Sequence, residues 1–493
     1  MIENSAAIVA ALVAYMAICL LLGFLAYRRT RTLGDFILGG RKLGSWVTAL
    51  SAQASDMSGW LLMGLPGLAY LAGLDAAWLA LGLAIGTWAN WRFVAARLRT
   101  RTERLTDSLT LPDYFERRFD DRSRVLRTIS AAFILVFFAF YTSSGFVAAG
   151  RLFETLFAIP YIEAMFWGSI VMLAYTFFGG FLAVSWSDVL QGTLMFLALV
   201  LVAALGVQLA GGVGPGVDAL SARDPALLDP FVGTGTETLG VLGVLSLLGW
   251  GLGYPGQPHI LARFMAIRRA DELTTSRRVA MGWVVTVLAA AVVVGLTGVL
   301  VLDPPLEGAD SEKVFILLAT EFFHPAIAGV CLSGILAAIM STASAQLLVS
   351  SSAFAEDFYR GFVRPDAGRA ELLWAGRLAV LGIAVVAFLL GLDPESRVLS
   401  LVAWAWAGFG AAFGPAIVLS LYWEGMTRNG ALAGIVVGGL TVIVWPQIEG
   451  PIFELYELVP GFVASAIAIV GVSLLETRRA ERVVKPRDTE AAS

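Results

Sequence analysis

Long apolar runs separated by short polar turns fill the chain from residue 6 to residue 476. Each run has about 20 residues or more, the length that an α-helix needs to cross the hydrocarbon core of a membrane. The pattern predicts thirteen membrane-spanning helices at residues 6–27, 44–70, 74–96, 125–157, 162–181, 185–210, 239–262, 280–302, 326–352, 372–391, 398–422, 430–447 and 458–476. We therefore expect an all-α polytopic membrane protein.

Composition and charge support this topology and orient it. Hydrophobic residues make up 58% of the chain and charged residues only 15%. Most of the 34 Lys and Arg residues lie in alternate loops, from Arg28 to the tail after Glu476. Basic loops stay in the cytoplasm, so an odd number of spans places the N-terminus outside and the C-terminus in the cytoplasm. These loops explain orientation, and we expect no nucleic-acid partner.

Two predicted spans are interrupted by residues that a regular helix tolerates poorly. Span two contains Ser51–Gly59 with the acidic Asp56, and a charge at that depth costs about 3 kcal/mol. Span seven contains Gly249–Pro258, where four glycines and two prolines weaken the helix and remove a hydrogen-bond donor. Freed backbone groups at membrane depth must be buried in protein or face a watery cavity.

The positions of the two interrupted spans suggest an internal symmetry. Span two opens a group of five spans, two to six, and span seven opens the next, seven to eleven. Because five is odd, the second group enters the membrane from the opposite side. Interrupted helices at matching positions of two inverted halves indicate the central site of a secondary transporter.

Asp56 has two interpretations. Asp commonly caps the start of a helix by accepting bonds from free backbone N–H groups. In the functional interpretation it supports cation binding and coupling and holds the break open. Both can hold together, since a cap at a broken helix would shape the site.

Span nine offers oxygen ligands for a cation. Ala338, Ser341 and Thr342 fall at i, i+3 and i+4 and share one helical face. A carbonyl and two hydroxyls could meet carbonyls freed at Ala54 and Met57, and sodium, a hard cation, prefers oxygen ligands. The alternative is a small-residue packing face between helices.

Aromatic residues lie beside polar positions in spans four and seven. Tyr141 precedes a polar run in span four, and Trp250 and Tyr254 stand four apart at the second break. Such rings suit a small, partly apolar solute. The alternative is that they are core or lipid-facing aromatics.

Several weaker candidates have local explanations. We expect Arg151 and Glu154 to pair near the outer boundary, and Asp188 to cap span six or act at an exit gate. The two histidines have no ligand spacing and are expected to be hydrogen-bonded structural groups: His259 and His324. Residues 111–115 and 312–323 predict short amphipathic helices outside the spans, and the polar tail after residue 476 predicts disorder.

Catalytic motifs are missing from the sequence. It holds no nucleophile–base–orienter set, zinc motif or ATP-hydrolysis motif, and Gly249–Gly253 lacks the features of a phosphate loop. We expect neither an enzyme nor an ATP-driven pump.

Strings of residues throughout the chain resemble the proline branch of the bacterial sodium:solute symporter family. They are Ala49–Ala52, Ser55–Gly67, Gly249–Tyr254, Gly256–Met265, Ile335–Ala338, Met340–Thr342 and Ala405–Pro415. The resemblance covers nearly all of residues 6–476 in order. It implies a leucine-transporter-type fold with a five-plus-five inverted repeat, and coupled import of sodium and L-proline.

The resemblance also implies roles for individual residues. The sodium ligands would be the carbonyls of Ala54, Met57 and Ala338 with the hydroxyls of Ser341 and Thr342. Binding and coupling would be supported by Asp56, Ser58 and Gly59. The proline contacts would be Tyr141, Trp250, Tyr254 and Pro258. Pro255 departs from the family, because a Phe is expected there and a shielding ring is therefore missing.

The chain divides accordingly into six parts. They are a first helix and basic loop (1–43), a first repeat (44–210), an outside loop (211–238), a second repeat (239–422), two peripheral helices (423–476) and a cytoplasmic tail (477–493). We expect a bacterial inner-membrane location, sodium as the co-transported ion and no obligate protein partner. The alternatives are the same machinery carrying pantothenate, a sugar or another amino acid, a transporter-fold sensor, or a channel.

Overall fold

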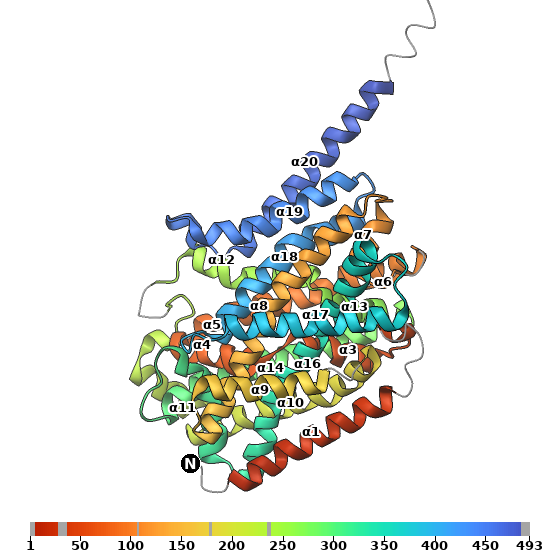
Figure 1. Ribbon diagram of the computed structural model, residues 1–493. Coiled ribbons are helices and arrows are strands. Elements are labelled where there is room, and N and C mark those ends of the chain that lie inside the picture. The colour runs from red at the N-terminus through yellow and green to blue at the C-terminus, as the bar shows by residue number, and fades with distance from the viewer. Residues whose placement is uncertain (1–4, 28–36, 106–107, 177–179, 234–237, 485–493) are drawn as a thin grey trace, which may run out of the picture.

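The computed structural model describes residues 5–27, 37–105, 108–176, 180–233 and 238–484, and these ranges are almost entirely helical. Isolated β-bridges, such as Leu43 with Ile267, are the extended pairings there. Figure 1 shows a bundle of tilted and crossing helices, with α1 on one flank and α20 projecting from the other. The arginines at 28, 29 and 31, which entered the orientation argument, and the last nine residues lie outside the described ranges.

The first predicted repeat and the helices around it have the following bounds. They are α1 (Ser5–Tyr27), α3 (Ser45–Asp56), η2 (Trp60–Gly64), α4 (Leu65–Ala72), α5 (Ala76–Ala89), η4 (Asn90–Val94), α6 (Ala95–Arg104), α7 (Leu111–Arg118), α8 (Val125–Phe157), α9 (Tyr161–Thr176), α10 (Phe181–Leu209) and α11 (Val213–Arg223). Pro112 in the first turn and the Thr110 hydroxyl, which accepts from the Asp113 amide, start α7. The short helix predicted at residues 111–115 is therefore confirmed.

The second half of the chain continues the bundle. Its elements are α12 (Val241–Gly249), η6 (Trp250–Gly256), α13 (Pro258–Ala266), α14 (Leu273–Val301), η8 (Gly308–Lys313), α15 (Val314–Phe322), α16 (Pro325–Ser352), η9 (Ala353–Val363), α17 (Arg369–Leu390), α18 (Val398–Tyr422), α19 (Arg428–Val444) and α20 (Leu458–Val484). The helix predicted over 312–323 is present as the end of η8 and α15. The disorder predicted after residue 476 is wrong as far as Val484, because α20 continues to that residue.

Ten helices in the described ranges are long and apolar enough to cross a membrane. The prediction of thirteen spans differs for two reasons. The apolar helices Tyr161–Leu173 and Val241–Gly256 are shorter than a full span, and Trp60–Arg104 counts as one continuous helical stretch. Gly73, with φ 76°, nevertheless turns the chain between α4 and α5. Large apolar side chains such as Leu21, Leu378 and Val385 are exposed, as expected for a lipid-facing surface.

The centre of the bundle is formed by α16, most of whose residues are buried. Its neighbours include α10, α8, α1 and α3, and α10 also packs against α3 and α14. Small residues allow these close approaches in a membrane, where apolar lipid removes the usual hydrophobic driving force between helices. The first interrupted helix is therefore held between α10, α14 and α16.

The two ends of the bundle differ in charge. One end carries α6, α7 and η9 with many arginines, and we call it the basic end; it lies to the right in Figure 1. At this end the Asp121 carboxylate is buried, which disfavours its charge, but hydrogen bonds from Ser123, the Leu126 amide and Arg428 outweigh burial and lower its pKa. Asp121 thus connects the loop before α8 to the starts of α8 and α19.

At the opposite end, Glu312 of η8 caps α18. Its carboxylate accepts the amides of Val398 at 2.9 Å and Leu399 at 3.1 Å. Burial raises the pKa of Glu312, although these amides and Arg151 oppose the shift. The predicted Arg151–Glu154 pair is wrong, because Arg151 faces Glu312 and Asp310 while Glu154 pairs with Lys313. Arg151 and Glu154 thus each pair with charged residues of η8 instead of with each other.

Glycines bring α5 against the second interrupted segment. A Cβ at Gly82 would overlap the Leu248 carbonyl, and one at Gly86 would overlap the Gly251 carbonyl. The contact is therefore backbone to backbone. It fixes the position of η6 and of the residues that η6 carries.

We expect Gly86→Ala to lower the unfolding temperature of the detergent-purified protein by several degrees. Overpacking at a closed contact costs about 1–3 kcal/mol. Gly282→Ala on α14 is the matched control, since a Cβ there meets nothing within 4 Å. Equal stability of the two variants would contradict the close contact.

Candidate functional site

The first helix break lies between α3 and η2. The α-helix ends at Asp56, and Met57 has non-helical backbone angles of φ −85° and ψ 83°. The freed carbonyl of Asp56 accepts hydrogen bonds from the Tyr141 hydroxyl at 3.2 Å and the Trp60 indole at 3.4 Å. Side chains of neighbouring segments thus satisfy a backbone group that the membrane cannot solvate.

An oxygen cluster joins α3 to α16 one turn before this break. The Ser341 hydroxyl lies 2.7 Å from the Ala54 carbonyl oxygen and 3.1 Å from that of Ala338, and the Thr342 hydroxyl lies 3.3 Å from Ala54. All four residues are buried. The structure thus brings together four of the five residues predicted to bind the ion.

Met57, the fifth predicted ligand, is buried and lies three residues after Ala54. No hydrogen bond of the described structure joins its carbonyl to the other four residues. The donor set suits a hard monovalent cation, because it consists of carbonyl and hydroxyl oxygens. In the described residues no group of three or more His, Cys, Asp or Glu side chains could hold a metal ion. The chemistry of the cluster therefore fits sodium better than a transition metal.

Asp56, Ser58 and Tyr254 place polar atoms beside the first break. The Asp56 carboxylate faces the Tyr254 hydroxyl, and the Ser58 hydroxyl faces that of Tyr141, without hydrogen bonds of standard geometry. Side-chain oxygens of Asp56, Ser58 and Tyr254 are all buried. Buried polar groups that lack good partners in the described structure are candidates for contact with a polar ligand.

Gly59, which was predicted to support binding, has a packing role in the structure. A Cβ there would lie 2.9 Å from the Ala148 Cβ and 3.3 Å from a side-chain carbon of Ile339. The break thus requires a residue without a side chain to fit between α8 and α16. This contact does not exclude a role of its backbone in binding.

The second helix break runs through η6 from Trp250 to Gly256. Gln257 is extended, and Pro258 then starts α13 at a position where a missing N–H is harmless. The Trp406 indole of α18 donates to the Trp250 carbonyl at 2.8 Å, and the Asn90 amide of η4 donates to the Tyr254 carbonyl at 3.2 Å. At both interruptions, side chains from other helices therefore donate hydrogen bonds to the freed backbone carbonyls.

Three polar groups at this break were not assigned roles from the sequence: Asn90, Gln257 and Trp406. Gln257 donates to the carbonyls of Gly253 and Trp406, both at 3.2 Å. Asn90 and Gln257 are buried amides inside apolar segments, the same signal that identified Asp56. Trp406 gives no such signal, since a Trp among apolar residues is usually a core residue.

The predicted aromatic contacts separate into two places. Tyr254 packs edge-on against Trp406 with ring centroids 5.0 Å apart and lies near Asp56. The Trp250 ring instead stacks on Tyr456, just before α20, at 5.4 Å and 22°. Pro255 lies inside η6 and is partly exposed, and as a proline it brings no aromatic side chain to the position where a Phe was expected.

The two histidines behave differently. His324 caps α16 by accepting from the Ala326 amide at 3.3 Å, which confirms its structural role. His259 is fully buried, yet neither ring nitrogen has a hydrogen-bond partner among the described residues, so the expected hydrogen bonding is wrong there. Its ring packs edge-on against Tyr141 and Phe138, because aromatic neighbours surround the start of α13.

Asp188 does not cap a helix, so this interpretation is wrong. α10 begins at Phe181, and Asp188 lies two turns inside it. Its carboxylate accepts from the Ser51 hydroxyl at 2.7 Å and pairs with Arg263 at 3.2 Å, all three being buried. Arg263 was counted with a basic loop, but α13 carries it into the protein, where it also stacks on Phe181.

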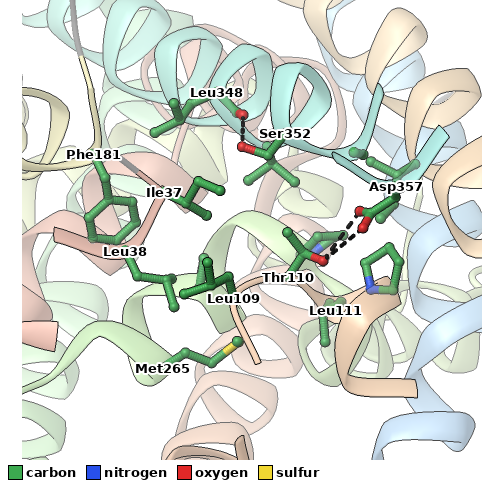
Figure 2. Close-up of a pocket in the computed structure, with 16 residues that line it drawn as sticks. Ile37, Leu38, Leu109, Thr110, Leu111, Phe181, Met265, Leu348, Ser352 and Asp357 are labelled. Atoms are coloured by element: carbon green, nitrogen blue, oxygen red, sulfur yellow. Dashed lines mark hydrogen bonds between the residues drawn. The ribbon is translucent and has the colours of Figure 1, made fainter. Parts of the chain in front are cut away.

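A cavity runs beside α13 from Pro258 toward the basic end (Figure 2). Pro258, Ala262 and Met265 line it at helical spacing and therefore share one face. The other walls come from residues 37 and 38, the start of α7 and the two residues before it, Ile134 of α8, Phe181 of α10, the end of α16 and the start of η9. The cavity is mainly apolar, with the Thr110 hydroxyl and the Asp357 carboxylate on one side.

Comparison with known proteins places this architecture. The model of the sodium:solute symporter family matches residues 36–438. The chain belongs to the sodium:solute symporter family. The sodium/proline symporter of Escherichia coli K12 is 51% identical over 461 residues, 92% of this chain and 90% of that protein. The high-affinity proline transporter PutP of Bacillus subtilis is 49% identical over 457 residues, 92% and 95% of the two chains.

Among solved structures, a Na⁺-coupled sialic acid symporter, determined in a substrate-bound outward-open state, is similar over 95% of this chain and 98% of its own. The TM-score is 0.76 at 19% identity. This similarity shows the fold of the chain: an all-helical bundle of the leucine-transporter type.

We expect Ser341→Ala to raise the sodium concentration for half-maximal transport by roughly tenfold or more. A hydrogen-bonding group that contacts a charge contributes about 1.5–3 kcal/mol. Ser333→Ala is the control, because that buried hydroxyl of α16 bonds only the Gly329 carbonyl of its own helix. An unchanged sodium dependence in Ser341→Ala would remove α16 from the ion site.

We expect Trp250→Ala to weaken solute binding about tenfold at saturating sodium, because the resemblance implies that this ring contacts the solute. Trp374→Ala is the matched control, since that ring is 59% exposed on α17. Binding is measured by scintillation proximity on purified protein. Wild-type affinity in Trp250→Ala would place this ring outside the binding pocket.

Proposed function

We propose that this protein couples inward sodium movement to uptake of L-proline by alternating access. The observation that carries this conclusion is the pair of proline-transporting relatives that are about half identical over more than nine-tenths of the chain. At such identity over such a length, fold and site are expected to be shared. The protein is a transporter of the inner membrane, and it is not an enzyme.

The sodium site that we propose consists of the carbonyls of Ala54, Met57 and Ala338 with the hydroxyls of Ser341 and Thr342. The close contacts between hydroxyls and carbonyls support it, because they bring the oxygens of two helices to one point. A sodium ion in their midst would exchange hydroxyl-to-carbonyl bonds for ion contacts. The ion would then tie α3 to α16.

Proline is a zwitterion with an apolar ring, so its site needs charge complementarity at one end and apolar walls at the other. We place its polar groups near the break at Ser58 and Gly59, where a helix start favours an anion. The proposed wall and orienting contacts are Tyr141, Trp250, Tyr254 and Pro258. Tyr141 would link the proline site to the first break, since its hydroxyl donates to the Asp56 carbonyl.

Asp56 would couple the two ligands. It lies between the oxygen cluster at Ala54 and the Tyr254 hydroxyl. A sodium ion that fixes the break also fixes the proline contacts, and reciprocity then requires that proline tighten sodium binding. One ion suffices energetically, because about 150 mV supplies about 3.5 kcal/mol and a tenfold gradient about 1.4 kcal/mol.

The topology that we propose has thirteen spans, with inverted repeats at 44–210 and 239–422 and interrupted helices in spans two and seven. Residues 1–43 and 423–476 are peripheral, 211–238 is an outside loop and 477–493 is a cytoplasmic tail. The basic end faces the cytoplasm because arginines stay on that side. The N-terminus is then outside and the C-terminus inside.

Uptake of labelled L-proline into proteoliposomes tests this function. We expect accumulation with an inward sodium gradient and an inside-negative potential, and none when choline replaces sodium on both sides. Unlabelled pantothenate, sugars and other amino acids serve as competitors. Stronger competition by one of these than by L-proline would assign another solute, while equilibration without accumulation would contradict symport.

A further inference from the structure

The cavity beside α13 connects a proposed proline contact with the basic end. Pro258 lies at one end of the lined face of α13, and Met265 lies two turns further along. The opposite wall is formed by Leu348, Val349 and Ser352 of α16. A solute that leaves the central site toward the cytoplasm would have to pass between these two helices or around them.

The cavity is too narrow for that passage. Its free space has room for about two water molecules. Proline has eight non-hydrogen atoms and needs several times that space. The walls must therefore separate before solute can pass, and the contacts that hold them together decide when they do.

One charged contact joins the η9 wall of the cavity to α8 and to the residue before α7. The Asp357 carboxylate of η9 pairs with Arg127 of α8 at 2.6 Å and accepts from the Thr110 hydroxyl, before α7, at 3.2 and 3.3 Å. Asp357 is fully buried and faces the cavity beside Thr110 (Figure 2). We infer that the cavity is the constricted release route for the solute, and that Asp357, held by Arg127 and Thr110, is the latch that closes it.

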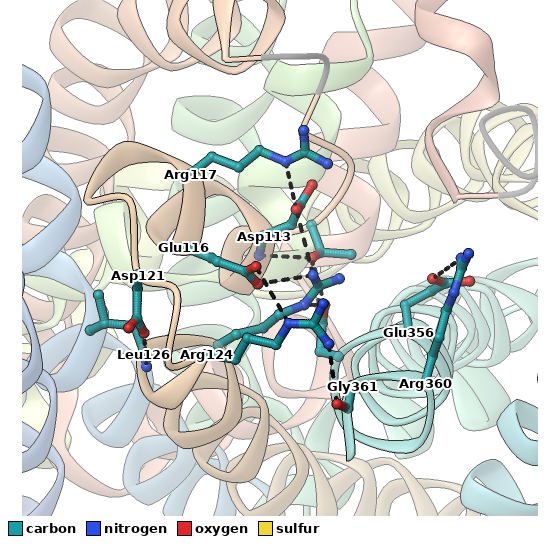
Figure 3. A network of polar contacts seen from close by, with 12 residues as sticks. Asp113, Glu116, Arg117, Asp121, Arg124, Leu126, Glu356, Arg360 and Gly361 are labelled. Atoms are coloured by element: carbon teal, nitrogen blue, oxygen red, sulfur yellow. Dashed lines mark hydrogen bonds and ion pairs between the residues drawn. The ribbon is translucent and has the colours of Figure 1, made fainter. Parts of the chain in front are cut away.

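Further charged side chains surround this ion pair, among them Asp113, Glu116 and Arg117 of α7 (Figure 3). Arg127 also bonds Glu116 at 3.0 Å and lies 3.8 Å from Asp113, which pairs with Arg117. Because Arg127 has acidic partners on α7 as well as on η9, it keeps a partner when η9 moves away. The carboxylates on α7 therefore lower the cost of opening, as a buried cation left alone would be strongly destabilised.

The helical geometry connects this latch to the proposed ion site. Thr342 and Asp357 belong to one continuous helical stretch, fifteen residues apart and thus about 20 Å along the axis. At Ala353 the stretch widens into a π-helix, a form often found at functional positions. Release of sodium from Ser341 and Thr342 would exchange ion contacts for hydroxyl-to-carbonyl bonds with Ala54, and the resulting shift of α16 against α3 would be carried along the stretch to its η9 end. This inference rests on the proposed function.

Cysteine labelling tests the latch. A Ser352→Cys reporter is placed in a background with Cys19→Ala and Cys331→Ala, and inside-out vesicles are treated with a membrane-impermeant maleimide. We expect slow labelling in sodium plus proline, and labelling several-fold faster after Asp357→Asn, because the ion pair that closes the route is lost. The same variant is expected to accumulate less proline while exchanging it faster across the membrane.

Glu356→Gln is the matched control, because that neighbouring acid pairs with the partly exposed Arg360. It should label and transport like the parent. If Asp357→Asn is not inserted, Thr110→Val removes the hydroxyl contact to Asp357, and with it the cap of α7, without changing charge, and should also speed labelling. Parent-like labelling in the tested variant would overturn the latch, even where the parent transports proline with sodium. Failure of the parent to transport would instead overturn the proposed function.

Discussion

The structure depends on how it satisfies backbone carbonyls that two broken helices release inside a membrane. Hydrocarbon offers no hydrogen bonds, so each freed group must find a protein partner or a bound ligand. At the first break, Tyr141 and Trp60 donate hydrogen bonds to the Asp56 carbonyl, and Ser341 and Thr342 donate to that of Ala54. At the second break, Trp406 donates a hydrogen bond to the Trp250 carbonyl and Asn90 donates to the Tyr254 carbonyl. In the sodium site that we propose, the freed carbonyl oxygen of Ala54 would also coordinate the ion.

This arrangement explains why an oxygen cluster and an aromatic cluster lie next to each other. α16, which supplies the hydroxyls, packs against α3 at the first break, and α18 packs against η6 at the second break. Glycines such as Gly59 and Gly86 allow both breaks to come close to their supports. At the site that we propose, ion binding would use the contacts that hold α3 against α16, and an ion that changes these contacts would change how the two helices pack.

The end of α3 at Asp56, the irregular segment after Gly249 and the contact of Ser341 and Thr342 with Ala54 could be anticipated because their signals are local. Asp56, the Gly- and Pro-rich segment after Gly249, and the spacing of Ser341 and Thr342 are visible within one helix turn or two. The buried pair of Asp188 with Arg263 could not be predicted, because its members are 75 residues apart and Arg263 resembled a loop residue. Arg151 paired with Glu312 for the same reason: partners across elements outweighed the neighbour three residues away.

Tyr456 belongs to neither of the proposed repeats, yet its ring covers that of Trp250, and its hydroxyl bonds the Ala403 carbonyl. The C-terminal segment thus supports the aromatic wall that we propose. That wall would then extend beyond the proposed repeats at 44–210 and 239–422. A chimera that exchanges only the last two helices between relatives with different solutes would inherit a different shape at Trp250, although every proposed ligand residue stayed the same.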